Sequence, residues 1–388
     1  MTAHGFPHAP FLFQTIDLPA CCHRMPFTTD YKEILAAIDN IDPIAYGRSR
    51  NFIDGAVTRL SPYISRGVVS TRLIMQRILQ KGYRPFQIQK MLQELAWRDY
   101  FQRVAMAHPD LLEKDIIQPQ IRREKTGMPI SIIHALTGIE GIDHSIRDLY
   151  ETGYMHNHCR MYTSALICNI GRYGWEAPAK WMYYHLLDAD FASNTCSWQW
   201  VAGAFSRKLY FANQENINKY CHTRQRNTFL DLDYPSLENM QVPEIMLRNE
   251  TPDYSTSLPE TIYPIIDPAK PTLVYNTYNL DPTWRKDEDA NRILLLEPSH
   301  FEKFPVCDRT LQFILDLSHN IPGIQVFTGS FQELKIPASN LRFKEHPLFK
   351  HYQGTEDERD WMFPDISWHS GGFFGFWKKY ERRLEKGL

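Results

Sequence analysis

The sequence lacks the features that mark membrane and secreted proteins. No stretch of its 388 residues approaches the roughly 20 consecutive apolar residues of a membrane-spanning helix. The first fifteen residues, MTAHGFPHAPFLFQT, have no basic start, no apolar core of signal length and no small-residue cleavage site. We therefore expect no secretion and no membrane association.

Cysteine is scarce, and the spacings typical of metal sites are missing. The chain has seven cysteines, an odd number, and none of them forms a Cys-x-x-Cys pair. Such a set favours reduced thiols in a cytoplasmic protein over a disulfide framework. His156 and His158 are metal ligands by residue type, but two residues two apart on a helix point to different faces. We expect no metal site.

The chain also lacks an excess of either charge, with 43 basic and 45 acidic residues. The total therefore argues neither for nor against a nucleic-acid partner. Basic residues nevertheless crowd residues 48–84, where Asp54 is the only acid. This segment predicts a phosphate-facing patch or, alternatively, a solvated helix face. The basic residues are Arg48, Arg50, Arg59, Arg66, Arg72, Arg77, Lys81 and Arg84.

The length and the hydrophobic pattern predict a mainly α protein with a smaller α/β-like region after it. We expect an N-terminal arm and short helix (1–45), a helical domain (46–230), a linker (231–270) and the α/β-like region (271–388). Residues 30–39, capped by Thr28 or Thr29, and residues 85–108 have helical apolar spacing. Strands are expected over 272–278, 292–297 and 324–327, with a helix over 310–319.

A polar and aromatic cluster follows a predicted helix end near residue 187. It comprises Asp188, Asp190, Asn194, Trp198 and Trp200. Each residue alone has an ordinary explanation, because Asp often caps a following helix and Trp often fills a core. The cluster as a whole exceeds what packing needs, and the 22 Phe, 20 Tyr and 9 Trp of the chain suit a flat ligand as well as a core.

Three earlier motifs accompany this cluster in the same order as in a known family. They are Thr58-Arg59-Leu60-Ser61, the run from Glu94-Leu95-Ala96-Trp97 to Tyr100, and the run from Gly153 to Met161 that contains Asn157 and Arg160. Read alone, the first is also an unremarkable helix cap, and Glu94 could simply pair with Arg98. Together the four motifs, over residues 46–221, resemble the photolyase and cryptochrome family.

The resemblance implies a helical domain that holds FAD without a Gly-x-Gly-x-x-Gly fingerprint, which the chain lacks. It implies that Tyr46 and the segment Thr58, Arg59, Leu60 and Ser61 grip the FAD phosphates. In the family pattern Arg160 pairs with Asp188 near the flavin. Asp190 lies near its polar edge, and Asn194 lies opposite its reactive nitrogen, where an amide can donate or accept a hydrogen bond.

The resemblance also implies light-dependent repair of damaged DNA, in which pyrimidine dimers are split by electron transfer from photoexcited FADH⁻. A flipped lesion would stack between Trp97 and Trp200, form a hydrogen bond with Glu94 and contact Asn157 and Met161. One alternative is a cryptochrome-like FAD photoreceptor without repair activity. Another is a helical FAD-binding or structural protein without photochemistry.

Three features depart from the family pattern. Too few residues precede Tyr46 for the usual α/β antenna domain, so a second chromophore stays open and the C-terminal α/β-like region is a candidate relative of that domain. His158 stands where repair enzymes commonly have Arg. Trp198 and Trp175 occupy the first two positions of the usual electron-transfer relay, whereas residues 110–136 contain no Trp for the third.

Overall fold

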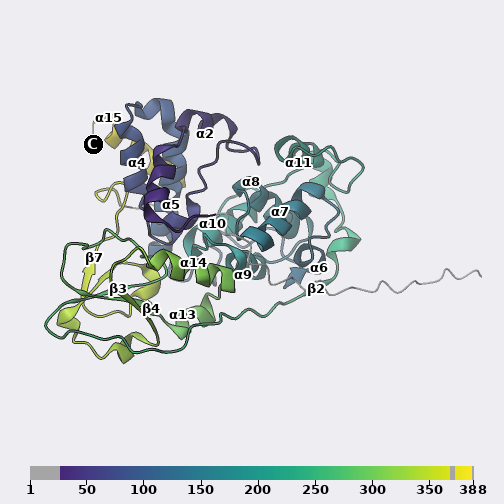
Figure 1. Ribbon diagram of the computed structural model, residues 1–388. Helices are drawn as coiled ribbons and strands as arrows, with labels where there is room; N and C mark the ends of the chain where they lie inside the picture. The colour runs from purple at the N-terminus through teal and green to yellow at the C-terminus, as the bar shows by residue number, and fades with distance from the viewer. Residues whose placement is uncertain (1–26, 368–371, 387–388) are drawn as a thin grey trace, which may run out of the picture.

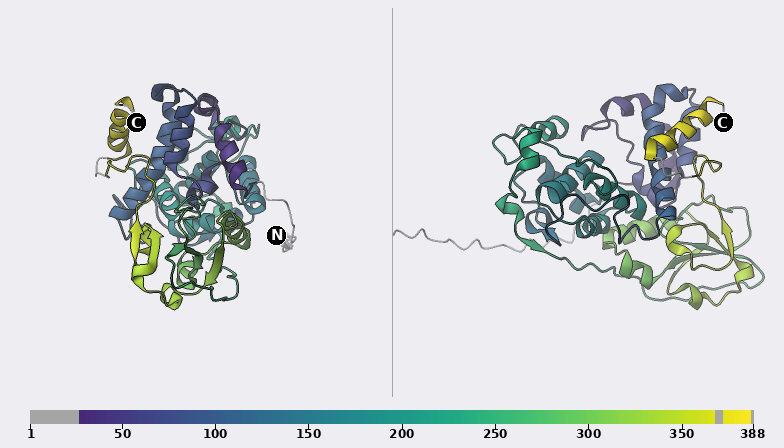
Figure 2. Two further views of the ribbon diagram at one scale, coloured as in Figure 1. Left: turned by 60° about the vertical axis from the view of Figure 1, so that its left-hand side comes forward. Right: turned by 180° about the vertical axis from the view of Figure 1, so that it is seen from behind.

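The computed structural model describes residues 27–367 and 372–386. The irregular arm expected over residues 1–27 lies outside this part apart from Phe27. Figure 1 shows a group of helices beside a small parallel sheet, and the two further views in Figure 2 show the same arrangement. Within the described ranges, no helix is both long and apolar enough to cross a membrane.

The helical part begins near the N-terminus and extends to residue 239. Its helices are α1 (Tyr31–Asp39), α2 (Pro43–Ser49), α3 (Ser61–Ser65), α4 (Thr71–Gln80), α5 (Gln89–Ala107), α6 (Ile130–Ile133), α7 (Glu140–Thr152), α8 (Asn157–Ala165), α9 (Glu176–His185), α10 (Phe191–Val201), α11 (Gln214–Cys221) and α12 (Tyr234–Asn239). A 3-10 turn, η1 (Pro85–Ile88), precedes α5, and a π-helical turn, η2 (Leu166–Ile170), continues α8.

Local side chains fix the ends of these helices. The cap of α1 is Asp30 rather than Thr28 or Thr29, because the Asp30 carboxylate accepts from the amides of Lys32 and Glu33. The predicted helix over 85–108 is divided, since Pro85 starts a 3-10 turn before α5. Gly153 ends α7 at φ 72°, a left-handed conformation that glycine adopts without steric cost.

The C-terminal part is a five-stranded parallel sheet in the order β5-β4-β3-β6-β7. Its elements are β3 (Thr272–Tyr275), β4 (Asn291–Leu296), α13 (Pro298–Lys303), α14 (Asp308–Ser318), β5 (Ile324–Thr328), the short 3-10 turns η4 (Phe331–Leu334), η5 (Ala338–Asn340) and η6 (Pro347–Phe349), β6 (Leu341–Lys344) and β7 (Thr355–Asp357). The mainly α fold with an α/β region is thus confirmed. The strand expected over 272–278 is shorter, because the chain turns between Asn276 and Asn279.

The segment between the two parts has little regular structure. It contains η3 (Glu244–Met246) and β2 (Asn249–Glu250), which pairs antiparallel with β1 (Met128–Pro129). Residues 251–267 are extended and carry exposed apolar side chains such as Ile262 and Ile265. This segment leads from the helices to the sheet, as Figure 1 shows.

Each end of the described chain contacts the part of the structure at the other end of the sequence: the N-terminal end contacts the sheet part, and the C-terminal end contacts the helical part. Near the N-terminus, the Asn320 side chain donates to the Thr29 carbonyl at 2.7 Å and accepts from the Tyr31 amide at 3.0 Å. At the other end, α15 (Gly372–Glu385) leaves the sheet and packs on α5, which Figure 1 shows beside it. The buried Asp99 carboxylate secures this return by accepting from the Met362 amide and the Tyr380 hydroxyl.

Candidate functional site

Four arginines from separate segments gather around two carboxylates in the helical part. We call this set the arginine cluster: Arg50, Arg59, Arg98 and Arg160, with Glu94 and Asp188. The ring of Tyr154 links two of the arginines, because the guanidinium carbons of Arg59 and Arg160 lie 6.0 and 5.7 Å from its centroid. Four positive charges against two negative ones leave the cluster with a net positive charge.

Asp188 is the buried centre of the arginine cluster. The Arg160 Nη2 atom lies 3.0 Å from both of its carboxylate oxygens, and Arg98 Nη2 lies 4.0 Å from one of them. Burial alone raises the pKa of this carboxyl, but attraction to Arg160 and Arg98 outweighs it and holds the pKa of Asp188 below its ordinary value. Asp188 is therefore ionised at neutral pH, and the contact that the family pattern implied for Arg160 is present.

Glu94 and Tyr46 lie on the other side of the cluster. Glu94 Oε1 is 3.4 Å from Arg50 Nε, so its partner is Arg50 rather than Arg98. Partial burial raises the pKa of Glu94 above its ordinary value, although the Arg50 charge opposes this shift. Burial also raises the pKa of the nearby Tyr46 hydroxyl, with a further contribution from Glu94. Tyr46 is therefore a neutral donor at this site.

The loop before α3 presents Arg59. Its backbone has φ 53°, a left-handed conformation that is uncommon for a residue other than glycine. The Arg59 side chain is exposed and, among the described residues, contacts the Tyr154 ring but forms no ion pair. Beside it, the Thr58 hydroxyl accepts from the Leu60 amide, and Ser61 contributes a hydrogen bond that lowers the pKa of Asp188. Backbone strain at a charged, unpaired side chain is typical of a ligand-holding position.

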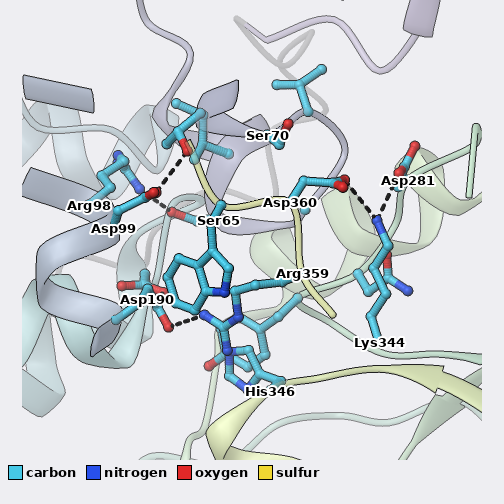
Figure 3. Close-up of a pocket in the computed structure, with 18 of the residues that line it drawn as sticks. Ser65, Ser70, Arg98, Asp99, Asp190, Asp281, Lys344, His346, Arg359 and Asp360 are labelled. Atoms are coloured by element: carbon cyan, nitrogen blue, oxygen red, sulfur yellow. Dashed lines mark hydrogen bonds and ion pairs between the residues drawn. The ribbon is translucent and has the colours of Figure 1, made fainter. Parts of the chain in front are cut away.

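Asp190 borders a polar cleft on the side of the helices that faces the sheet. One of its oxygens caps α10 by accepting from the Ser193 amide at 2.7 Å, and the other accepts from Gln102 at 2.6 Å. Figure 3 shows Asp190 in this cleft with Arg98, Asp99 and residues that follow the strands. The simple explanation of Asp190 as a helix cap is thus correct in part, because one oxygen is committed to the helix.

Asn194 lines a different cleft from Asp190. Its amide donates to the Ala179 carbonyl of α9 at 2.9 Å. Together with Trp175, Phe191 and Phe304 it borders a cleft of about 230 Å³ between α9, α10 and α13. The resemblance placed Asn194 with Asp188 and Asp190 at one ligand, whereas here its donor points toward α9. The Asn194 amide points this way because α10 packs against α9, which brings the Ala179 carbonyl within reach.

The two tryptophans expected to flank a flat ligand lie in different surroundings. Trp97 stacks on Phe373 of α15, with ring centroids 3.6 Å apart and planes 8° apart. Trp200 is 37 % exposed, and its ring centroid lies 6.0 Å from that of Tyr210. In this arrangement the Trp97 face is covered by the C-terminal helix, a contact that no local sequence pattern predicts.

The remaining predicted residues surround the start of α8 and the core beneath α10. Asn157 is exposed and Met161 half-buried. His158 Nδ1 donates to the Asn51 carbonyl at 3.0 Å, and the imidazole packs on the ring of Tyr220. Trp198 and Trp175 are both buried, and Trp175 donates to Asp115 at 2.7 Å.

The basic segment 48–84 is not a single phosphate-facing patch. Arg66 is almost completely buried and donates to the Leu187 carbonyl, and Arg77 pairs with Asp39. Arg50 and Arg59 belong to the arginine cluster. The helical turns between these residues spread their side chains over different faces, so neither a single patch nor a simple solvated face describes them.

Two contributors to the site were missed from the sequence, Tyr154 and Gln102. Tyr154 lies inside the run from Gly153 to Met161, where its aromatic ring next to Arg160 was the available signal. Gln102 follows Arg98 by one helical turn, so the i, i+4 spacing on α5 could have indicated that both face Asp188 and Asp190.

Residues 91–262 match the family model described as the FAD binding domain of DNA photolyase. Among relatives, the deoxyribodipyrimidine photo-lyase of Alkalihalophilus pseudofirmus is 28 % identical over 248 residues, which cover 58 % of this chain and 49 % of that protein. The enzyme of the same name from Streptomyces griseus is 32 % identical over 152 residues, covering 38 % and 32 %. The chain thus spans at most about half the length of these relatives.

Matches among solved structures include a cryptochrome from Synechocystis, at 24 % identity and a TM-score of 0.46, which covers 50 % of this chain and 44 % of that one. A class III photolyase from Agrobacterium tumefaciens has 23 % identity and a TM-score of 0.43, covering 49 % and 44 %. The cofactor of the matched domain is FAD. Residues 91–262 are thus similar to the FAD binding domain of DNA photolyase, and the relatives described above carry photolyase names.

Proposed function

We propose that the protein is a light-dependent DNA repair flavoprotein that splits pyrimidine dimers. The proposal rests on the family match and on relatives that carry the name deoxyribodipyrimidine photo-lyase. The single observation that supports it best is the arginine cluster, in which all four family motifs meet around Asp188. Such convergence of separate segments is what a cofactor site requires.

The donor set of the arginine cluster fits the diphosphate of FAD. Arg59 offers a guanidinium with no ion-pair partner among the described residues, next to the Thr58 and Ser61 hydroxyls. Guanidinium groups bind phosphate oxygens through paired, charge-assisted hydrogen bonds. We infer that Arg59, Thr58, Leu60, Ser61 and Tyr46 hold the diphosphate, and that Arg160 and Asp188 lie beside the flavin.

Bound FAD in its reduced, light-excited form would supply the electron that opens the cyclobutane ring. The chain's own residues would bind and orient the lesion. Glu94, whose pKa is raised by burial, would hydrogen-bond a thymine edge. Asn157 and Met161, at the exposed start of α8, would contact the lesion from the opposite side, and Trp200 is accessible for stacking.

One observation favours a second candidate, an FAD photoreceptor of the cryptochrome type without repair activity. Phe373 covers the face of Trp97 on which a lesion would stack. A repair enzyme would have to move α15 before Trp97 could contact DNA, whereas a photoreceptor would not.

A dimer-containing oligonucleotide tests the proposal. Purified, chemically reduced protein of known flavin content is mixed with it under near-UV light and in the dark. Light-dependent loss of dimers at substoichiometric protein supports repair, and Glu94→Ala should then lower the repair yield while flavin content stays the same. Bound FAD without repair supports the photoreceptor. Protein that cannot be loaded with FAD contradicts both.

A further inference from the structure

The polar cleft beside Asp190 lies at the switch point of the parallel sheet. In the order β5-β4-β3-β6-β7, the chain adds strands on one side of β3 and then crosses to the other side with β6. The cleft is lined by residues that follow β3, such as Asn276 and Asn279, and residues that follow β6, such as His346. Parallel sheets bind ligands outside the carboxyl ends of their strands at this position.

The cleft contains buried polar atoms that lack partners. Asn276 and Asn279 are 1 % and 4 % exposed, yet the Asn276 Nδ2 atom and both amide atoms of Asn279 have no hydrogen-bond partner within the described residues. The same holds for Ser193 Oγ and Arg359 Nη2, which approach from α10 and from the loop after β7. Each unsatisfied buried polar group costs about 1–3 kcal/mol, so this concentration indicates a site for a hydrogen-bonding ligand.

The charged groups in the cleft are already paired with one another. Lys344 Nζ lies 3.0 Å from Asp281 and 3.2 Å from Asp360, and Arg359 donates to Glu345 at 2.7 Å. Figure 3 shows Lys344 between its two carboxylates. Burial lowers the pKa of His346 far below its ordinary value, so this imidazole adds no charge at neutral pH. Carboxylates outnumber cations in the lining: Asp99, Asp190, Asp281, Glu345 and Asp360 against Arg98, Lys344 and Arg359.

These features restrict the ligand. An excess of carboxylates repels phosphate and other anions, so a neutral ligand is favoured. The atoms without a hydrogen-bond partner are three N–H donors, the Asn279 oxygen, the Ser193 hydroxyl and one Glu345 carboxylate oxygen. This mixture suits hydroxyl groups, which both accept and donate. The cleft has a volume of about 120 Å³.

We propose that this cleft binds a small neutral polyol of the pentose class, either a free sugar or the sugar of an uncharged nucleoside. Asn276 and Asn279 would hold it from the sheet, and Ser193 and Arg359 from the opposite wall. The proposal goes beyond the repair function and depends on neither light nor DNA.

Titration calorimetry with D-ribose, adenosine and ribose 5-phosphate tests this site, using the purified protein with its flavin content recorded. We expect saturable binding of ribose or adenosine at one site. Binding of adenosine but not of ribose indicates a nucleoside ligand. Binding of ribose with the same affinity as adenosine indicates a free sugar. If ribose 5-phosphate binds more tightly than ribose, the inference of a neutral ligand is wrong. Absence of saturable binding, or binding only to flavin-free protein, would overturn the proposal.

Two variants separate a ligand site from a structural water site. Asn279→Leu removes two unpartnered atoms, so it should reduce sugar affinity at least tenfold without lowering the melting temperature. Ser193→Ala is a smaller change on the other wall and should weaken binding several-fold. Asn239→Ala, an exposed position on α12, serves as the matched control. A lowered melting temperature with unchanged affinity in Asn279→Leu would contradict the proposal.

Discussion

The indole of Trp97 and the ring of Phe373 lie parallel, with centroids 3.6 Å apart and an angle of 8° between their planes. Phe373 is itself buried, and α15 carries it from the C-terminal end of the chain onto α5. A residue expected to meet DNA is therefore in contact with the protein's own last helix. The stacking of Phe373 on Trp97 is therefore the first contact to test by substitution.

Replacing Phe373 with Leu should lower the free energy of unfolding by about 1–2 kcal/mol, because the side-chain volume is largely kept and the ring stacking is lost. Urea denaturation measures the change. Phe374→Leu is the matched control. The Phe374 ring is 70 % exposed, so this substitution should change the free energy of unfolding little. Equal losses in the two variants would show that the stack contributes nothing.

The same Phe373→Leu variant tests the covering role of α15. Loosening the stack should expose Trp97 and raise the affinity for single-stranded DNA if Trp97 is a DNA contact. Filter binding at fixed salt, compared with the Phe374 variant, gives the result. Unchanged affinity would indicate that Trp97 is a core residue.

The ion pair at the centre of the arginine cluster predicts a pH dependence. The pKa of Asp188 is lowered in the folded protein, so its stabilising effect is present above the unfolded pKa and is lost as pH falls through the folded one. In Arg160→Met, burial should dominate and raise that pKa, at a cost of about 3 kcal/mol at pH 7 for breaking a buried pair. The stability difference between variant and wild type should then shrink as pH falls through the raised pKa of Asp188 in the variant.

Arg160→Lys is the control for that experiment, because it keeps the charge but not the planar fork. It should recover part of the lost stability and keep the wild-type pH dependence. A stability difference that does not change with pH in Arg160→Met would mean that Asp188 is not governed by Arg160.

Arg59→Ala should weaken FAD retention tenfold or more, since a charged hydrogen bond contributes about 1.5–3 kcal/mol. Release of flavin during equilibrium dialysis measures the loss. Arg72→Ala removes an exposed arginine from α4 of the same basic segment and should leave retention unchanged. Similar losses in both would point to general charge rather than to a phosphate contact at Arg59.

Tyr380→Phe should destabilise the protein by about 1–2 kcal/mol, because Asp99 loses one of its donors in a buried site. Thermal or urea unfolding detects this loss. Tyr234→Phe, at a half-exposed ring, should be close to neutral. If Tyr380→Phe is also neutral, the α15 return does not depend on Asp99.

Local patterns were sufficient for the elements with strong apolar periodicity. The strands that begin at Thr272, Asn291 and Ile324 coincide with apolar runs. By contrast, β6 has four residues and β7 three, and both contain charged side chains, so neither is long enough to show a periodic pattern. The observed N-cap of α1 is Asp30, one residue after the predicted Thr29. The sequence could not decide between them, because Asp and Thr are both favoured N-cap residues.

The sequence indicated one side-chain contact of the candidate site and left others undetermined. Arg160 lies against Asp188, as the resemblance implied. The side-chain partner of Glu94 is Arg50, and Asn194 turns toward α9, because both depend on how distant helices pack. The cover on Trp97 depends on a segment some 275 residues away, which no window of local sequence contains.

The two crossing ends of the chain also affect how it unfolds. Asn320 holds the start of α1 against the sheet part, and Tyr380 holds the last helix against α5. A protease that cuts within the extended residues 251–267 would therefore leave two fragments still bound together. The helices and the sheet should lose structure in one cooperative transition, with neither part melting as an independent unit.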